Sequence, residues 1–65
     1  MWKLSADGTF AKNKETGKVC KIELRRDRLY RVKKNYKTLA TFTTMEDAKN
    51  FLADTVKKWN GEENV

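Results

Sequence analysis

Residues 23–34, ELRRDRLYRVKK, hold the side chains with the clearest chemical potential in this chain. Six of the twelve are Lys or Arg, and four arginines lie between residues 25 and 31. A planar guanidinium forms paired hydrogen bonds with a phosphate or with the edge of a guanine, and the Lys ammonium adds a point charge. This composition is typical of a surface that binds a polyanion.

Charge is distributed unevenly along the rest of the chain. Residues 1–44 carry twelve basic and four acidic side chains, a net charge of +8, whereas residues 45–65 carry three basic and five acidic side chains, a net charge of −2. We therefore expect a polyanion to dock on the N-terminal two thirds of the chain. Nucleic acid, an acidic protein and an anionic lipid surface are the classes that fit.

Catalytic or metal chemistry has little support in these 65 residues. There is no histidine, and the single Cys20 has neither a base for nucleophilic catalysis nor a second cysteine for metal binding. The acids show no paired spacing on one element that would indicate hydrolysis, and the glycines lack the spacing of a phosphate loop. The sequence predicts no enzyme activity, no cofactor and no metal.

The expected location follows from missing signals. No apolar run approaches the ~20 residues of a membrane helix, and no export-type apolar segment follows residues 1–8. A lone cysteine fits a reducing compartment. The sequence therefore predicts a cytoplasmic protein.

The clearest structural element is an amphipathic helix over residues 45–59. Thr43 or Thr44 is expected to cap it, because an acid follows each by three residues, and Asn60-Gly61 is expected to end it. Residues 1–61 would then form a single domain, followed by a frayed tail at residues 62–65. The apolar face consists of Met45, Ala48, Phe51, Leu52, Val56 and Trp59.

Before this helix the hydrophobic period changes to two, which predicts strands. Residues 19–25 and 29–34 would form a hairpin around a short loop, and residues 38–42 a further strand with a bulge or bend. Trp2 to Leu4 and a short piece around Phe10 would add to the sheet. The residues expected to face the core are Cys20, Ile22, Leu24, Tyr30 and Val32. The predicted fold class is α+β, with a three- or four-stranded antiparallel sheet packed on one C-terminal α-helix.

The other face of the hairpin is the candidate nucleic-acid site, because a two-stranded ribbon of this width fits the major groove of DNA. Glu23 lies within this face and would pair with Arg31 or accept a hydrogen bond from cytosine. The candidate contact residues, with one loop tyrosine that could stack on a base, are Lys21, Arg25, Arg26, Arg28, Arg31, Lys33, Lys34 and Tyr36. Two plainer interpretations stay open: the basic face is a solvated, edge-protecting surface, or Tyr36 closes its loop over the core.

One stretch resembles a known family. Tyr30-Arg31-Val32, a short turn and then residues 39–48, LATFTTMEDA, are similar to the strand-to-helix segment of DNA-binding domains with three antiparallel strands and one C-terminal helix. Such domains occur in plant ethylene-response factors and as the arm-binding domains of phage and transposon integrases. The residues that occupy the motif are Leu39, Phe42, Thr44, Glu46, Asp47 and Ala48, with Ala40 where the family usually has glycine.

The resemblance implies a sheet that lies in the major groove, with the contacts made by outward-facing strand residues. These would be Lys21, Glu23, Arg25, Arg31 and Lys33.

The sequence thus predicts a small nucleic-acid-binding module, with double-stranded DNA favoured over RNA, in an accessory or regulatory role of the kind that phages and mobile elements encode. The alternative is a protein-binding module, such as a phage-type inhibitor that docks on an acidic host protein, and charge alone does not separate the two. A membrane partner is not expected, because surface binding calls for a basic amphipathic helix and this helix lies in the acidic part of the chain.

Overall fold

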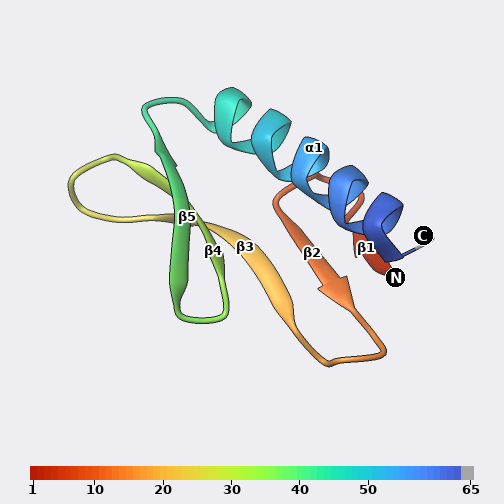
Figure 1. Ribbon diagram of the computed structural model, residues 1–65. Coiled ribbons are helices and arrows are strands. Elements are labelled where there is room, and N and C mark those ends of the chain that lie inside the picture. Colours follow the sequence, from red (N-terminus) through yellow and green to blue (C-terminus); the bar gives the residue numbers. More distant parts are fainter. Residues whose placement is uncertain (64–65) are drawn as a thin grey trace.

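The computed structural model describes residues 1–63 as one antiparallel sheet and one helix (Figure 1). The five strands lie in sequence order, each hydrogen-bonded to the next. The elements are β1 (Trp2–Leu4), β2 (Phe10–Asn13), β3 (Val19–Leu24), β4 (Tyr30–Lys34), β5 (Lys37–Phe42) and α1 (Met45–Glu63). The predicted α+β class is confirmed, whereas the expected count of three or four strands was wrong.

The two short strands at the N-terminus account for the difference in count. β1 has three residues and β2 has four, too few for alternation to identify a strand securely. Turns bring them into register: Gly8 and Gly17 adopt φ values of 76° and 73°, which glycine reaches without a steric penalty. Trp2 then lies opposite Asn13, and Phe10 lies opposite Lys21 on β3.

The helix α1 covers one face of the sheet and contacts all five strands. Aromatic pairs connect both ends of the helix to the sheet: the ring centroids of Trp2 and Trp59 are 4.6 Å apart, and those of Phe42 and Phe51 are 5.3 Å apart. The buried apolar side chains between them are Trp2, Ala11, Cys20, Val32, Ala48, Leu52 and Val56. Because this core is small, any binding surface has to lie on the outside of the fold.

The start of α1 agrees with the sequence, and its end does not. Thr44 caps the helix, since its Oγ1 accepts a hydrogen bond from the Asp47 backbone N–H at 3.2 Å. The expected stop at Asn60-Gly61 was wrong, because the helix continues to Glu63. Of the expected tail, residues 62 and 63 belong to the helix, and residues 64–65 lie outside the described part of the chain.

Asn60 has a different role from the one expected. Its Oδ1 accepts a hydrogen bond from the Trp2 backbone N–H at 2.7 Å, and its Nδ2 donates to the Trp2 carbonyl oxygen at 3.0 Å. The side chain therefore pairs with the edge strand β1 as a neighbouring strand would. This double contact fastens the first strand of the sheet to the last turns of the helix.

The predicted irregularity in β5 is confirmed. Val32 pairs with Ala40 and Lys33 pairs with Thr38, so Leu39 is an extra residue on β5. Both Leu39 and Phe42 pack against the core. The extra residue shifts the alternation of β5, so Leu39 and Phe42, three positions apart, can both face the core.

Candidate nucleic-acid interface

The face of the sheet opposite α1, here called the open face, is defined by the strand register. Its side chains alternate with buried Ala11, Cys20 and Val32, and no element of residues 1–63 covers it in Figure 1. The residues that the register places on the open face are Lys3, Phe10, Lys12, Val19, Lys21, Glu23, Arg31, Lys33, Thr38 and Thr41. The predicted outward direction of Lys21, Arg31 and Lys33 is therefore confirmed.

Lysines lie opposite one another on this face. Lys3 of β1 pairs with Lys12 of β2, and Lys21 of β3 pairs with Lys33 of β4. Like charges directly opposite on neighbouring strands are destabilising. Among residues 1–63, no carboxylate forms an ion pair with Lys3, Lys12 or Lys21. The open face thus carries uncompensated positive charge across three adjacent strands.

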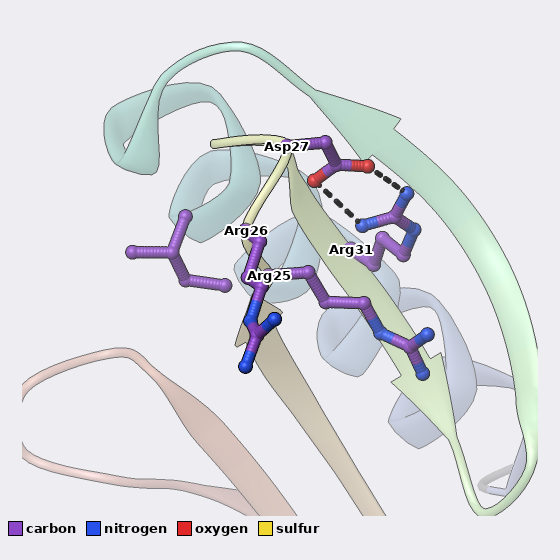
Figure 2. A pocket seen from close by; sticks show the side chains of 5 residues that line it. Arg25, Arg26, Asp27 and Arg31 are labelled. Carbon is purple, nitrogen blue, oxygen red and sulfur yellow. Dashed lines mark hydrogen bonds and ion pairs between the residues drawn. The ribbon is translucent and has the colours of Figure 1, made fainter.

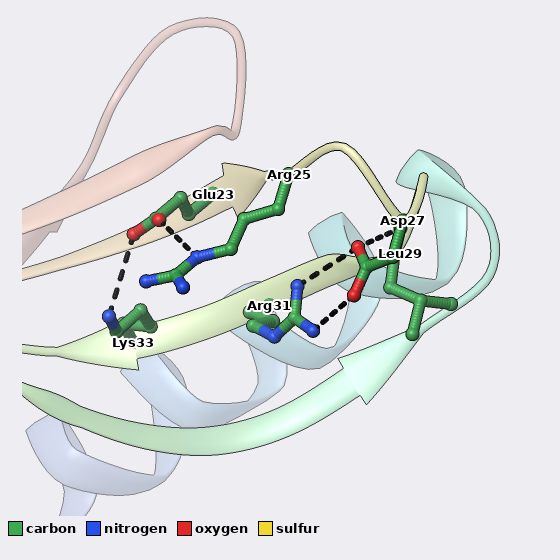
Figure 3. Close-up of polar contacts among 6 residues, drawn as sticks. All are labelled: Glu23, Arg25, Asp27, Leu29, Arg31 and Lys33. Atoms are coloured by element: carbon green, nitrogen blue, oxygen red, sulfur yellow. Dashed lines mark hydrogen bonds and ion pairs between the residues drawn. The ribbon is translucent and has the colours of Figure 1, made fainter.

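Glu23 compensates part of the positive charge of the β3–β4 hairpin (Figure 3). Its carboxylate is 2.7 Å from Arg25 Nε and 3.6 Å from Lys33 Nζ. The hydrogen bond from Arg25, followed by the charges of both cations, lowers the pKa of Glu23. The expected Glu23–Arg31 pair was wrong, although the two residues are opposite each other in register.

Arg31 pairs instead with Asp27, in the loop between β3 and β4. The two terminal guanidinium nitrogens of Arg31 donate to the two carboxylate oxygens, Nη1 to Oδ1 and Nη2 to Oδ2, and the Leu29 backbone N–H donates to Asp27 Oδ1 at 3.1 Å. The Arg31 hydrogen bonds, with a smaller effect from Leu29, lower the pKa of Asp27 to about 2. Asp27 therefore stays ionised at neutral pH and holds Arg31 toward the loop.

Two arginines of the same loop, Arg26 and Arg28, have no carboxylate partner within the described chain. Figure 2 shows Arg26 and Arg25 beside a hollow that is also lined by Leu24, Asp27 and Arg31, and the drawn contacts join only Asp27 and Arg31. Arg26 is exposed and forms no ion pair within residues 1–63.

Arg28 is the second of these arginines. It is exposed, forms no ion pair in the described chain, and has a positive φ of 63° where the loop turns back to β4. A left-handed conformation at a residue other than glycine is uncommon and costs roughly 1–2 kcal/mol. The tip of the hairpin thus presents two free guanidinium groups on a tightly turned backbone.

Lys34 belongs to the other face of the sheet. It lies opposite buried Cys20, and its Nζ is 4.7 Å from the ring centroid of Trp59 and 5.7 Å from that of Trp2. The prediction that Lys34 extends the outer basic face was therefore wrong, because residue 34 follows Val32 by two positions and shares its direction. Burial, opposed in part by the charge of Lys34, raises the pKa of the Cys20 thiol to about 11, so this buried side chain is a neutral thiol.

Tyr36 is 99% exposed at the turn between β4 and β5. It packs on no core residue, so the interpretation that it closes its loop over the core was wrong. The hollow beside it is lined by Val19, Lys21 and Asn35. Tyr36 therefore flanks the open face next to one of its unpaired lysines.

Leu24 is the remaining residue whose expected position was wrong. It is 56% exposed, although it pairs with Tyr30 and was expected in the core. β2 pairs with β3 only as far as Lys21, so the end of the β3–β4 hairpin extends beyond the N-terminal strands (Figure 1). Tyr30 and Phe42, in the same cross-strand row, pack against the core, whereas Leu24 lies at the end of β3 where β2 no longer pairs with it.

The two lysines and the phenylalanine that β1 and β2 add to the open face were missed in the sequence: Lys3, Lys12 and Phe10. The available signal was the order Phe10-Ala11-Lys12, in which a small buried residue separates two exposed ones. Because Ala11 is only weakly apolar, the alternation around it did not stand out. The charged surface is accordingly wider than the predicted hairpin.

Comparisons with known proteins give no relative for this arrangement. No protein-family model, curated protein or solved structure matches the chain. Within the described residues, no helix has the length and apolar character that crossing a membrane requires, and no group of three or more metal-binding side chains occurs.

Proposed function

We propose that the protein is a small nucleic-acid-binding module that holds phosphates on its open face and at the tip of the β3–β4 hairpin. The observation that carries this proposal is the placement of Lys3 opposite Lys12, together with exposed Lys21 opposite Lys33, whose charge Glu23 partly compensates. A like-charged pair without a carboxylate partner, such as Lys3–Lys12, opposes folding by roughly 0.2–1 kcal/mol. A face needed only for solubility would be more stable with alternating signs, whereas an incoming polyanion removes the repulsion.

The free cations define the footprint. Those exposed on the open face or at the hairpin tip without an ion-pair partner among residues 1–63 are Lys3, Lys12, Lys21, Arg26 and Arg28. Arg25, Arg31 and Lys33 are already held by carboxylates, which fixes their direction and lowers the charge they offer. Tyr36 adds an exposed ring at the border of this footprint.

Sheet width limits how a duplex would bind. Five strands at ~4.8 Å spacing place the outer strands about 19 Å apart, more than the ~12 Å width of the major groove. Only β3, β4 and β5 reach the projecting end of the hairpin, where the same spacing gives about 10 Å. A duplex, with DNA as the expected form, would therefore meet the hairpin end first, in the accessory or regulatory role expected from the sequence.

Salt dependence tests the proposal. Five phosphate contacts give a slope of log K against log salt of about −3.5 for a single strand or −4.5 for a duplex. Fluorescence anisotropy of a labelled oligonucleotide should then show affinity falling roughly 100- to 500-fold between 50 and 200 mM salt. An affinity that is insensitive to salt would contradict phosphate binding.

A matched pair of variants places the site on the open face. Lys12→Ala with Lys21→Ala removes two open-face lysines, and Lys57→Ala with Lys58→Ala removes two exposed lysines of α1. Both variants have the same net charge. We expect only the first to weaken binding strongly and to reduce the salt slope by about 2; equal losses would indicate non-specific attraction by total charge.

A further inference from the structure

Two large aromatic side chains lie exposed among the open-face lysines. Phe10 is 46% exposed and Tyr36 is 99% exposed, whereas the other aromatic residues of the described chain pack against the core. Resting on the proposed function, we infer that the open face binds unpaired, single-stranded nucleic acid, with Phe10 and Tyr36 as the residues on which bases stack.

Phe10 lies in a setting that suits a nucleotide. It is directly opposite Lys21 across the β2–β3 pair. The hollow beside it combines an apolar lining with three lysines and is formed by Lys3, Leu4, Ser5, Ala6, Phe10, Lys12 and Lys14. A base can lie on the ring while the ammonium groups hold the phosphates on either side, the combination found in channels for single strands.

Tyr36 forms the second position. Its hollow is shared with Val19, Asn35 and Lys21. Lys21 is thus the cross-strand neighbour of Phe10 and also a wall of the Tyr36 hollow. A strand that crosses the sheet from β2 toward the β4–β5 turn would place a base at each ring and a phosphate at Lys21 between them.

The aromatic residues decide between single and double strands. In a duplex each base is already stacked between its neighbours, so an exposed ring gains nothing from it without unstacking. An unpaired base offers its face to any aromatic ring, whatever the sequence. Lysines alone would serve either form, whereas Phe10 and Tyr36 contribute only to the unpaired one.

Three labelled ligands of equal length test the inference by fluorescence anisotropy with the whole chain. They are a twelve-residue deoxythymidine oligonucleotide, an abasic strand with the same phosphates, and a twelve-base-pair duplex. We expect the oligonucleotide to bind at least tenfold more tightly than the abasic strand. Phe10→Ala and Tyr36→Ala should each weaken oligonucleotide binding roughly 5- to 150-fold. Neither substitution should change the abasic affinity by more than about twofold, because stacking needs a base.

Leu24→Ala is the matched control, since Leu24 is exposed to a similar extent as Phe10 and has the direction of the core-facing residues. It should leave the ratio of oligonucleotide affinity to abasic-strand affinity unchanged, because Leu24 has no ring on which a base can stack. If Phe10→Ala failed to fold, Tyr36→Ala would still test the inference, because a side chain that is 99% exposed does not support the core.

The outcomes separate this inference from the proposed function. Equal affinities for the oligonucleotide and the abasic strand, or variants without effect, would overturn the stacking role and leave phosphate binding intact. Tighter binding of the duplex would likewise overturn single-strand recognition alone. If none of the three ligands bound in a salt-sensitive way, both proposals would fail.

Discussion

Lys12→Glu should make the protein more stable and a weaker nucleic-acid binder. Lys3 and Lys12 are exposed and directly opposite each other on β1 and β2. The substitution removes a repulsion of roughly 0.2–1 kcal/mol and replaces it with an attraction of similar size. The free energy of unfolding should therefore rise by about 0.4–2 kcal/mol, which corresponds to a Tm increase of roughly 2–16 °C for a domain of this size.

Circular dichroism during thermal and urea unfolding measures this change, at low salt and again at 1 M salt. The stabilisation should shrink at 1 M, where the screening length falls to about 3 Å. Lys18→Glu is the control, because it causes the same change in net charge in the turn before β3, outside every cross-strand pair of strand residues. We expect its effect on stability to stay within about 0.5 kcal/mol.

The reasoning would be refuted if Lys12→Glu were no more stable than Lys18→Glu, or if its gain survived high salt. The like-charged pairs would then impose no cost on folding. In that case the observation on which the proposed function rests would lose its force, whatever the binding data showed.

Three other predictions concern parts of the fold outside that pair. Lys34→Met loses the cation–π contact with Trp59 but also the repulsion from Lys37, which lies opposite Lys34, so the free energy of unfolding should change by less than about 1 kcal/mol. Oligonucleotide affinity should stay within twofold, since this side chain is on the helix side. Asn60→Ala should cost about 1–3 kcal/mol and speed amide hydrogen exchange in β1, because both backbone groups of Trp2 lose their partner; unchanged exchange would contradict that role. The pKa of Asp27 is about 2 in the folded protein and near 3.9 in an unfolded chain, so its contribution to stability is complete above pH ~4 and is lost as the pH falls through 2. Asp27→Asn should therefore show a shallower loss of stability between pH 4 and 2 than the unsubstituted protein in acid unfolding curves.

The sequence predicted the central residues of the longer strands, where the alternation is clear. β3 has six residues and β4 has five, and their pattern correctly placed Cys20 and Val32 in the core and Lys21 outside. The start and the buried face of the helix were also predicted, since apolar residues that repeat every three to four positions are typical of an amphipathic helix. Local periodicity thus fixed the two layers of the fold.

Other features depend on contacts between distant segments, which periodicity does not report. The exposure of Leu24 follows from how far the hairpin extends past its neighbours, and the helical conformation of Gly61 accompanies the bonds between Asn60 and β1. Lys34 was misplaced because a cation is normally assigned to the solvent side. Here two tryptophan rings provide a favourable surface for it on the helix side.

Ion pairing also moves the centre of the candidate site away from the segment that first suggested it. In the hairpin, Glu23 forms ion pairs with Arg25 and Lys33, and Asp27 forms one with Arg31. This arginine-rich stretch therefore offers less unpaired positive charge than its composition indicates. The lysines of β1, β2 and β3 have no such partners within residues 1–63, and the exposed ring of Phe10 lies among them. The proposed nucleic acid would therefore contact more unpaired lysines if it ran across the strands, from the N-terminal edge toward the β4–β5 turn, than if it lay along the hairpin.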